Sequence, residues 1–338
     1  MSIIMIPRSI RRALLAPTVA VALIAPAFLA VAGAGPANAL EPIPPIFATW
    51  HEQNLASPAS RIDETMTDAA GAVWYADNDA QEIVRIDPLT TAMTAFTLGP
   101  SNPRVGSMVQ ALDGNIWFAD HENLTVDRLD VVTGVVDLFD IGALAAAPRS
   151  IVAGADGALW FGVPARGLIR MTLDGRYTVL AEPTGEVVSH TTATADGRIW
   201  YALQNTDQIG VYNPKTSSFT HLVVPGASPV RDIEVSLDGD VWALTDDGIS
   251  QIAADVSSTT LHLFPGTGTR INPSRLVAGI HAEMYFIDGA GGFGRVDGSG
   301  MTTLNRIPFS GFRSSTLAID GFGSLWVSDW SRNVIAWV

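Results

Sequence analysis

Polar side chains recur at one equivalent position in seven segments of this chain. The position lies six residues before the aspartate of an Asp-Gly turn, or before the residue that replaces this aspartate. Because the segments resemble one another, we expect these side chains to gather around a common axis of the fold. They are Glu64, Ser107, Ser150, His190, Asp232, Arg275 and Thr316, and the charged residues that directly precede members of this set are Asp63, Arg149 and Arg231.

His190 is the member of this set best suited to proton transfer. An imidazole titrates near neutral pH, so it is an effective general base there. The sequence identifies no partner for His190, and a histidine without a partner is also typical of a hydrogen-bonded structural residue. We treat His190 as a candidate catalytic base and keep the structural interpretation open.

Four aspartates occupy a second recurring position. Each lies three residues after an aromatic residue that also recurs in every segment. Together with the first set they predict a site that is acidic on one side, where a cation can bind, and basic on the other, where an anionic or carbonyl group can be oriented. The alternative is that these side chains only tie loops together. The candidate ligand-binding residues are Glu64, Asp77, Asp120, Arg149, Arg231, Asp232, Arg275, Asp288 and Asp329.

Oxygen-rich triplets suggest a metal ion near two of these aspartates. Asp120-His121-Glu122 and the triplet at 77–79 occupy equivalent places in neighbouring repeats. Carboxylate and amide oxygens are ligands for Mg²⁺ and Ca²⁺, so Asp120 and His121 are candidate ligands of one of these ions. Polar residues are also usual in turns, and the spacing fits no established ligand loop.

An aromatic repeat defines the elements that must position these residues. Seven short motifs share one equivalent aromatic position, which recurs every 40 to 43 residues: Trp74, Trp117, Trp160, Trp200, Trp242, Tyr285 and Trp326. This period, with one small sheet per repeat, is typical of a β-propeller. We predict an all-β, seven-bladed propeller in which the aromatic residues pack between blades.

The second repeat shows how one blade is built. β-favouring runs lie at 108–111, 115–119, 125–129 and 135–139, and Asp-Gly and Thr-Gly pairs supply hairpin turns between the first two runs and between the last two. Each blade is therefore predicted to be a four-stranded antiparallel meander. If the first strand lines a central channel, the recurring polar positions fall in the loops that enter it, at one end of the disc.

The two ends of the chain predict how the ring closes. The last repeat stops at Val338 before a fourth strand, whereas 46–53 resembles an outer strand. Pairing between these ends removes two open sheet edges. We therefore assign 46–338 to a single propeller domain, in which the N-terminal strand completes the last blade, and 40–45 to an extended leader.

The first 39 residues predict export. Arg8, Arg11 and Arg12 precede an apolar stretch at 13–34, and Ala37-Asn38-Ala39 is a typical cleavage site for a signal peptide. The chain has no cysteine and a net charge of −14, which disfavours nucleic acid as a partner. We expect a monomeric protein that is secreted or periplasmic in the cell envelope, with no membrane attachment after cleavage.

The repeat motifs also resemble a known family. DGNIWFAD at 113–120, QEIVRIDPLTTAMTAF at 81–96, and DGALWFGV at 156–163 followed by GLIRMTLDGRYTVL at 167–180 are similar to blades of the streptogramin B lyase (virginiamycin B lyase) family. The resemblance implies a seven-bladed propeller and an elimination that opens the macrocyclic ester of a cyclic peptide antibiotic with a magnesium ion. The histidines of that family lie in Pro-His-x-Ile entries, whereas the corresponding entries here, at 229–233, 273–276 and 314–317, contain none.

Two functions remain in view from the sequence. The first is a binding module of the cell envelope, which presents the channel mouth to a small molecule, a peptide or an envelope protein. The second is an enzyme, either a metal-assisted carbon-oxygen lyase or a lactone- or ester-opening hydrolase. In that enzyme His190 would be the base, Asp120 would hold the cation, and Arg149 or Arg231 would stabilise negative charge.

Overall fold

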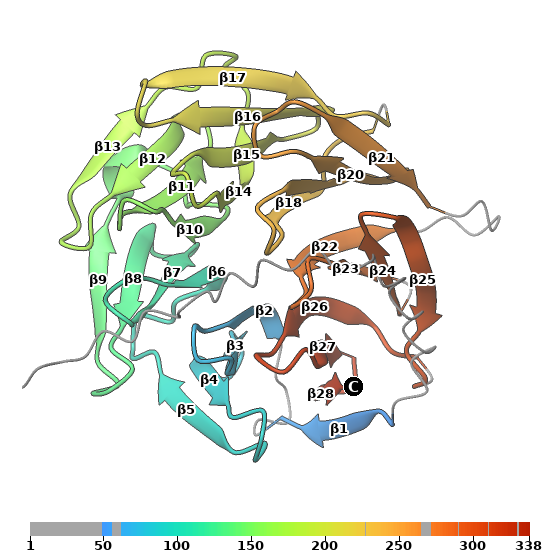
Figure 1. The fold of residues 1–338 in the computed structure, drawn as a ribbon. Coiled ribbons are helices and arrows are strands. Elements are labelled where there is room, and N and C mark those ends of the chain that lie inside the picture. Colours follow the sequence, from blue (N-terminus) through green and yellow to red (C-terminus); the bar gives the residue numbers. More distant parts are fainter. Residues whose placement is uncertain are drawn as a thin grey trace, which may run out of the picture. The chain divides into compact units, whose positions relative to one another are not determined.

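Each repeat folds into one four-stranded antiparallel sheet, and seven such sheets stand around a central axis (Figure 1). The computed structural model describes residues 49–55, 62–226, 228–264, 272–289, 291–309, 311–329 and 331–338. The predicted seven-bladed propeller is confirmed. The predicted leader at 40–45 and signal peptide at 1–39 lie outside the described residues.

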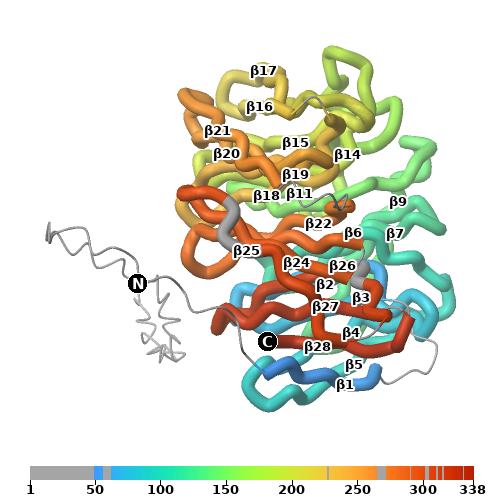
Figure 2. Tube along the Cα trace, turned by 90° about the vertical axis from the view of Figure 1, so that its right-hand side faces the viewer, coloured from blue at the N-terminus to red at the C-terminus, as the bar shows by residue number. Residues whose placement is uncertain are grey.

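The blades follow one another along the chain, and each begins with its innermost strand (Figures 1 and 2). Blade 1 comprises β2 (Ile62–Thr67), β3 (Val73–Asp77), β4 (Glu82–Ile86) and β5 (Met93–Thr97). Blade 2 comprises β6 (Val105–Gln110), β7 (Ile116–Asp120), β8 (Thr125–Leu129) and β9 (Val136–Asp140). Blade 3 comprises β10 (Ile151–Ala153), β11 (Leu159–Val163), β12 (Gly167–Met171) and β13 (Tyr177–Leu180), and the short 3-10 helix η1 (Gly142–Leu144) precedes it.

The remaining blades follow the same plan. Blade 4 comprises β14 (Val188–Ala193), β15 (Ile199–Leu203), β16 (Gln208–Asn213) and β17 (Ser218–Val223). Blade 5 comprises β18 (Asp232–Val235), β19 (Val241–Leu244), β20 (Gly248–Ile252) and β21 (Thr259–Leu263). Blade 6 comprises β22 (Pro273–Ala278), β23 (Met284–Asp288), β24 (Gly292–Asp297) and β25 (Gly300–Arg306). Blade 7 comprises β26 (Ser314–Ile319), β27 (Leu325–Asp329), β28 (Val334–Trp337) and β1 (His51–Asn54).

The repeated aromatic residues form the packing between blades, as predicted. The six tryptophans of the series are at most 2% exposed. Trp74 of blade 1 packs in one cluster with Ile116 and Phe118 of blade 2, and Trp117 of blade 2 packs with Leu159 of blade 3. A sheet covered on both faces in this way buries consecutive side chains, which explains why the second strand of every blade is buried throughout.

The N-terminal strand closes the ring, as the sequence indicates. β1 pairs antiparallel with β28, with His51 opposite Trp337 and Asn54 opposite Val334. The observed strand begins at His51 and ends at Asn54, so it starts later than the predicted run, and residues 46–48 lie outside the described part. Figure 2 shows the C-terminus beside β1. Among the described residues no helix has the length and hydropathy that a membrane crossing requires.

A close backbone contact joins blades 1 and 7 and yields a testable prediction. A Cβ atom on Gly71, whose φ is +84°, would lie 2.7 Å from the Cα atom of Gly321. Gly71→Ala should therefore cost about 2 kcal/mol of unfolding free energy beyond the cost of the positive φ, since neither backbone can yield. Gly114→Ala is the matched control, because Gly114 has φ of +79° and no neighbour within 4 Å. Equal melting temperatures for the two variants would contradict the argument.

Candidate functional site

The inner strands carry a local irregularity where they enter the channel. The register shifts in five of them, between Ile62 and Glu64, Val105 and Ser107, Val188 and Thr191, Pro273 and Arg275, and Ser314 and Leu317. A β-bulge turns the next side chain away from the regular alternation. The repeat pattern predicted that the recurring polar positions lie in entering loops. Instead, Glu64, His190, Asp232 and Arg275 belong to the strands themselves.

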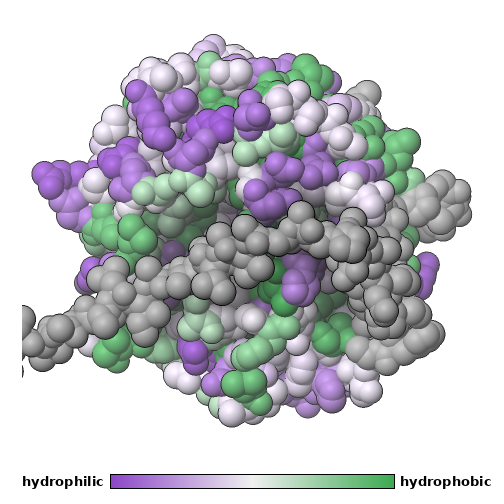
Figure 3. Space-filling view, viewed as in Figure 1, coloured by the Kyte–Doolittle hydropathy of each residue, from purple (hydrophilic) through white to green (hydrophobic). Residues whose placement is uncertain are grey.

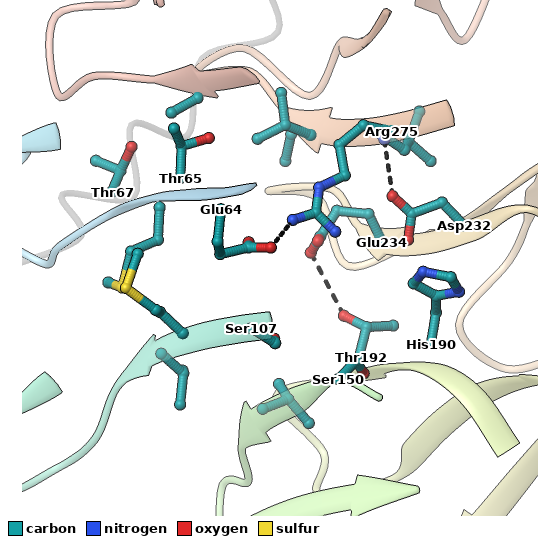
Figure 4. Close-up of a pocket in the computed structure, with 18 of the residues that line it drawn as sticks. Glu64, Thr65, Thr67, Ser107, Ser150, His190, Thr192, Asp232, Glu234 and Arg275 are labelled. Carbon is teal, nitrogen blue, oxygen red and sulfur yellow. Dashed lines mark hydrogen bonds and ion pairs between the residues drawn. The ribbon is translucent and has the colours of Figure 1, made fainter. Parts of the chain in front are cut away.

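The central channel encloses a cavity of about 460 Å³. Its size lies within the usual range of about 300–1,000 Å³ for ligand pockets. The polar and charged side chains on its wall include Glu64, His190, Thr192, Asp232, Glu234 and Arg275 (Figure 4). The structure therefore brings together four of the predicted site residues from blades 1, 4, 5 and 6.

Arg275 is the cationic centre of this cavity. Its guanidinium reaches from blade 6 to the carboxylate of Glu64 on blade 1 and forms an ion pair with it (Figure 4). Asp232 is held differently. Its two carboxylate oxygens accept backbone N–H groups of Ile233 and Leu276, each at 2.9 Å. Asp232 is therefore fixed by the backbone and adds negative charge beside Arg275.

Glu234 lies two residues after Asp232 on the same strand. Its Oε1 accepts the backbone N–H of Val235 at 3.0 Å and lies 3.4 Å from the hydroxyl of Thr192. Burial raises the pKa of Glu234 to about 7, although the Val235 N–H opposes this shift. Burial also raises the pKa of Glu64 to about 7, against the opposing effect of Arg275. Both carboxyl groups thus titrate near neutral pH.

His190 lies where the channel meets a second pocket. Its side chain lines both cavities, and its Nδ1 is sealed from solvent without a hydrogen-bond partner among the described residues. Burial lowers the pKa of His190, although the charge of Asp232 acts in the opposite direction. The imidazole is therefore neutral at neutral pH, which is the form that accepts a proton.

The second pocket, of about 230 Å³, forms the basic side of the channel mouth. Arg149, His121, Arg231, Gln204 and Asn205 contribute to its wall. Arg231 is held by Asp246, with two hydrogen bonds of 2.8 Å. The exposed guanidinium of Arg149 makes no hydrogen bond or ion pair among the described residues. Arg149 is thus the cation that remains available to a ligand in this pocket.

His121 reaches this pocket because of a glycine in the inner strand of blade 2. A Cβ atom on Gly106 would lie 2.2 Å from Cε1 of the His121 ring, so the ring rests directly on the strand backbone. Burial lowers the pKa of His121, and the charges of Arg104 and Arg149 lower it further. A neutral imidazole therefore stands beside Arg149.

A neighbouring part of the mouth is acidic. A cleft of about 350 Å³ between blades 1 and 2 is lined by Asp63, Asp79 and Glu122, with Arg104 as its cationic side chain. The charges at this end of the channel are therefore distributed unevenly. Figure 3 shows hydrophilic and hydrophobic residues interspersed over the visible parts of the face seen in Figure 1.

The four aspartates at the ends of the second strands lie elsewhere. Asp77, Asp120, Asp288 and Asp329 are at most 8% exposed and line neither the channel nor the basic pocket. Each accepts backbone N–H groups of the adjoining loops. The donors are Ala80 for Asp77, Arg104 and Glu122 for Asp120, Asn272 for Asp288, and Ser331 for Asp329. This arrangement corresponds to the loop-tying alternative.

The predicted metal ligands do not converge in the structure. Oδ1 of Asp120 accepts backbone N–H groups, and its Oδ2 accepts the side-chain amide of Asn123 at 2.6 Å. His121 turns toward Gly106. Across the part of the chain that the structure describes, no group of three or more His, Cys, Asp or Glu side chains is placed to hold a metal ion. A Mg²⁺ or Ca²⁺ ion at Asp120 stays a prediction.

Two channel residues, Glu234 and Thr192, were missed by the sequence analysis. Both face the repeated aromatic residue across the first hairpin, because Thr192 pairs with Trp200 and Glu234 with Trp242. In a strand, residues two apart point to the same side. Thr192 and Glu234, two residues after His190 and Asp232, could therefore have been predicted to face the channel from the sequence.

The fold and the polar channel define a seven-bladed propeller with a candidate ligand site on its axis. Virginiamycin B lyase from Staphylococcus aureus is similar in structure, with a TM-score of 0.76 and 21% identity over 86% of this chain and 98% of that one. A structure described as streptogramin B lyase gives 0.75 and 20%, over 86% and 96%. YCF48 bound to D1 peptide gives 0.68 and 13%, over 86% and 96%.

These likenesses establish the fold, and at such low identity they do not extend to activity. No protein-family model matches the sequence, and a search of curated proteins gives no match. The expected structural resemblance to virginiamycin B lyase is nevertheless confirmed.

Proposed function

We propose that this protein is an exported binding module that takes an anionic group of a small molecule or peptide at the basic side of the channel mouth. The observation that carries the proposal is the unpaired guanidinium of Arg149 in a pocket with two neutral imidazoles. A guanidinium binds a carboxylate through two parallel hydrogen bonds, which gives both affinity and orientation. The side-chain amides of Gln204 and Asn205 supply further donors for the ligand.

The proposal also covers the location of this module, its class of partner and its oligomeric state. The leader at 1–39 supports export to the periplasm or the outside of the cell, and the net charge of −14 supports a partner other than nucleic acid. The closed ring, with its terminal strand edges paired, supports a monomer. An envelope protein with an exposed carboxylate is a partner of the same chemistry.

Binding of a simple carboxylate tests the proposal. N-acetylglycine should bind to the wild-type protein in calorimetry, and N-acetylglycinamide, which lacks the charge, should bind more weakly. Arg149→Ala should reduce the affinity for N-acetylglycine by about 10- to 100-fold, because a hydrogen bond to a charged group contributes about 1.5–3 kcal/mol. Arg176→Ala is the control, since Arg176 is exposed on blade 3 and paired with Asp174.

The outcome is decisive in either direction. Equal affinity of the wild type for the acid and the amide would show that no anion is recognised. Equal affinity of the wild type and Arg149→Ala for the acid would assign the anion to another group.

One observation favours an enzyme as the second candidate. The neutral ring of His190, which lines the basic pocket, is suited to remove a proton while Arg149 stabilises the negative charge that develops. The reaction would be a carbon-oxygen elimination or the opening of a lactone or ester. Turnover of cyclic depsipeptides and lactones with Mg²⁺ or Ca²⁺ should then be lost in His190→Ala, and equal rates in both proteins would remove His190 as the base.

A further inference from the structure

The channel contains more negative than positive groups. Three carboxylates, of Glu64, Asp232 and Glu234, line the cavity together with one guanidinium, that of Arg275 (Figure 4). Arg275 is engaged by Glu64 through Oε2. A second positive charge in the cavity would therefore be attracted by carboxylates that Arg275 alone does not neutralise.

Two of the carboxylate oxygens remain available. Glu64 uses Oε2 for Arg275, and Glu234 uses Oε1 for Val235 and Thr192. The second oxygen of each has no hydrogen-bond partner among the described residues, whereas both oxygens of Asp232 are occupied by backbone N–H groups. Neither oxygen is among the sealed atoms that lack a partner, so both are open to the cavity and can accept a hydrogen bond from a ligand there.

His190 supplies an independent indication of a ligand. Its ring makes no hydrogen bond among the described residues, although it lines the same cavity; Nδ1 is shielded from solvent, so Nε2 is the nitrogen that a ligand in the cavity can reach. A neutral imidazole keeps one lone pair that accepts a hydrogen bond. Glu64, Glu234 and His190 thus provide three acceptors, and a primary ammonium group carries three N–H donors.

We propose that the channel binds a small organic cation, whose primary ammonium group donates to Glu64, Glu234 and His190. This site lies in the channel, whereas the proposed anion site lies in the basic pocket at its mouth; His190 lines both, but the carboxylates of the first and Arg149 of the second are separate groups. An ammonium is proposed here rather than a metal ion, because the described residues contain no group of three or more His, Cys, Asp or Glu side chains that could hold a metal. The cavity volume of about 460 Å³ accommodates an alkylamine.

Binding of the ammonium should be linked to proton release. The charged and titratable groups that face Glu234 are Asp232 on its own strand, His190 on β14, Arg275 on β22 and Glu64 on β2. An ammonium binds the ionised carboxylates, which are a minority at about pH 6 and the majority at about pH 8 when the pKa is about 7. Affinity should therefore rise about tenfold between these pH values for each carboxylate that must be ionised, and about a hundredfold if both must be.

Calorimetry with n-propylammonium chloride tests the proposal on the full-length protein. The wild type should bind the amine, and the heat at neutral pH should differ between buffers of different ionisation enthalpy, because protons are released. Glu234→Gln should weaken binding at least tenfold. Glu186→Gln is the matched control, since Glu186 is exposed and lines neither cavity.

Several results would overturn the proposal. These are absence of n-propylammonium binding to the wild type, equal affinity of the wild type and Glu234→Gln, or displacement of the amine by Mg²⁺ or Ca²⁺, which would identify a metal site. Should Glu234→Gln not fold, buffer-independent binding heats for the wild type would still contradict it. The n-propylammonium cation has no carboxylate or other anionic group. The outcome of this experiment is therefore separate from that of the Arg149 experiment.

Discussion

Replacement of Arg275 by methionine should lower the free energy of unfolding by about 3–5 kcal/mol at about pH 8. The substitution removes the guanidinium but keeps much of the side-chain volume, so Glu64, Asp232 and Glu234 remain in the cavity without a cation. Removal of one partner of a buried ion pair leaves an uncompensated charge, and this is the main cost. Urea unfolding followed by tryptophan fluorescence measures the change.

The effect should depend on pH in a defined direction. Between about pH 4.5 and pH 7 folded Glu64 and Glu234 keep protons that the unfolded chain releases, so wild-type stability falls as the pH rises and levels off above this range. Without Arg275 the pKa of Glu64 rises further, because Arg275 lowers it in the wild type. The loss caused by Arg275→Met should therefore be smaller at about pH 5 than at about pH 8.

Arg275→Lys separates charge from geometry. It keeps the positive charge but lacks the planar fork of the guanidinium, so its stability should lie between those of the wild type and Arg275→Met. A cost of Arg275→Met that is equal at about pH 5 and pH 8 would mean that packing, not charge, makes Arg275 important.

Removal of β1 should open the ring. A chain that starts after Asn54 lacks the strand that pairs with β28, the stacking of His51 on Trp337 and the ion pair between Glu52 and Arg332. The loss should be about 2–4 kcal/mol, since each ladder hydrogen bond contributes about 1 kcal/mol net. The exposed edge of β28 should also pair with other copies and produce oligomers.

Light scattering coupled to size-exclusion chromatography measures this effect. The control is a chain that starts at Ala48 and keeps β1 intact. A shortened protein that remains monodisperse and melts at the temperature of the control would show that β1 is dispensable for closure.

The architecture could be predicted from the sequence because it repeats. One aromatic residue per 40 to 43 positions, with glycine turns at constant offsets, identifies the blade and its number of copies. The pairing of both chain ends followed from counting strands. The same alignment of repeats identified four residues of the site, because they occupy one recurring position: Glu64, His190, Asp232 and Arg275.

The rest depended on side-chain geometry that a repeat pattern does not encode. The repeat pattern placed both Asp120 and Arg149 at the channel mouth. In the structure the carboxylate of Asp120 accepts backbone N–H groups, whereas the side chain of Arg149 is exposed. The contact between Arg275 and Glu64 joins residues 211 positions apart, across the channel. The β-bulges that direct side chains inward are also not marked by one residue type. The residues that follow them differ, since they include Glu64, Ser107 and Arg275.

The pairing of β1 with β28 also sets the order of events during biosynthesis. His51 and its partner Trp337 are 286 positions apart, so the ring cannot close until synthesis has reached β28. Prematurely terminated products retain an unpaired N-terminal strand and lack a finished seventh blade. Such fragments expose unpaired backbone to proteases and chaperones, so a closed ring distinguishes chains that contain β28 from chains that stop before it.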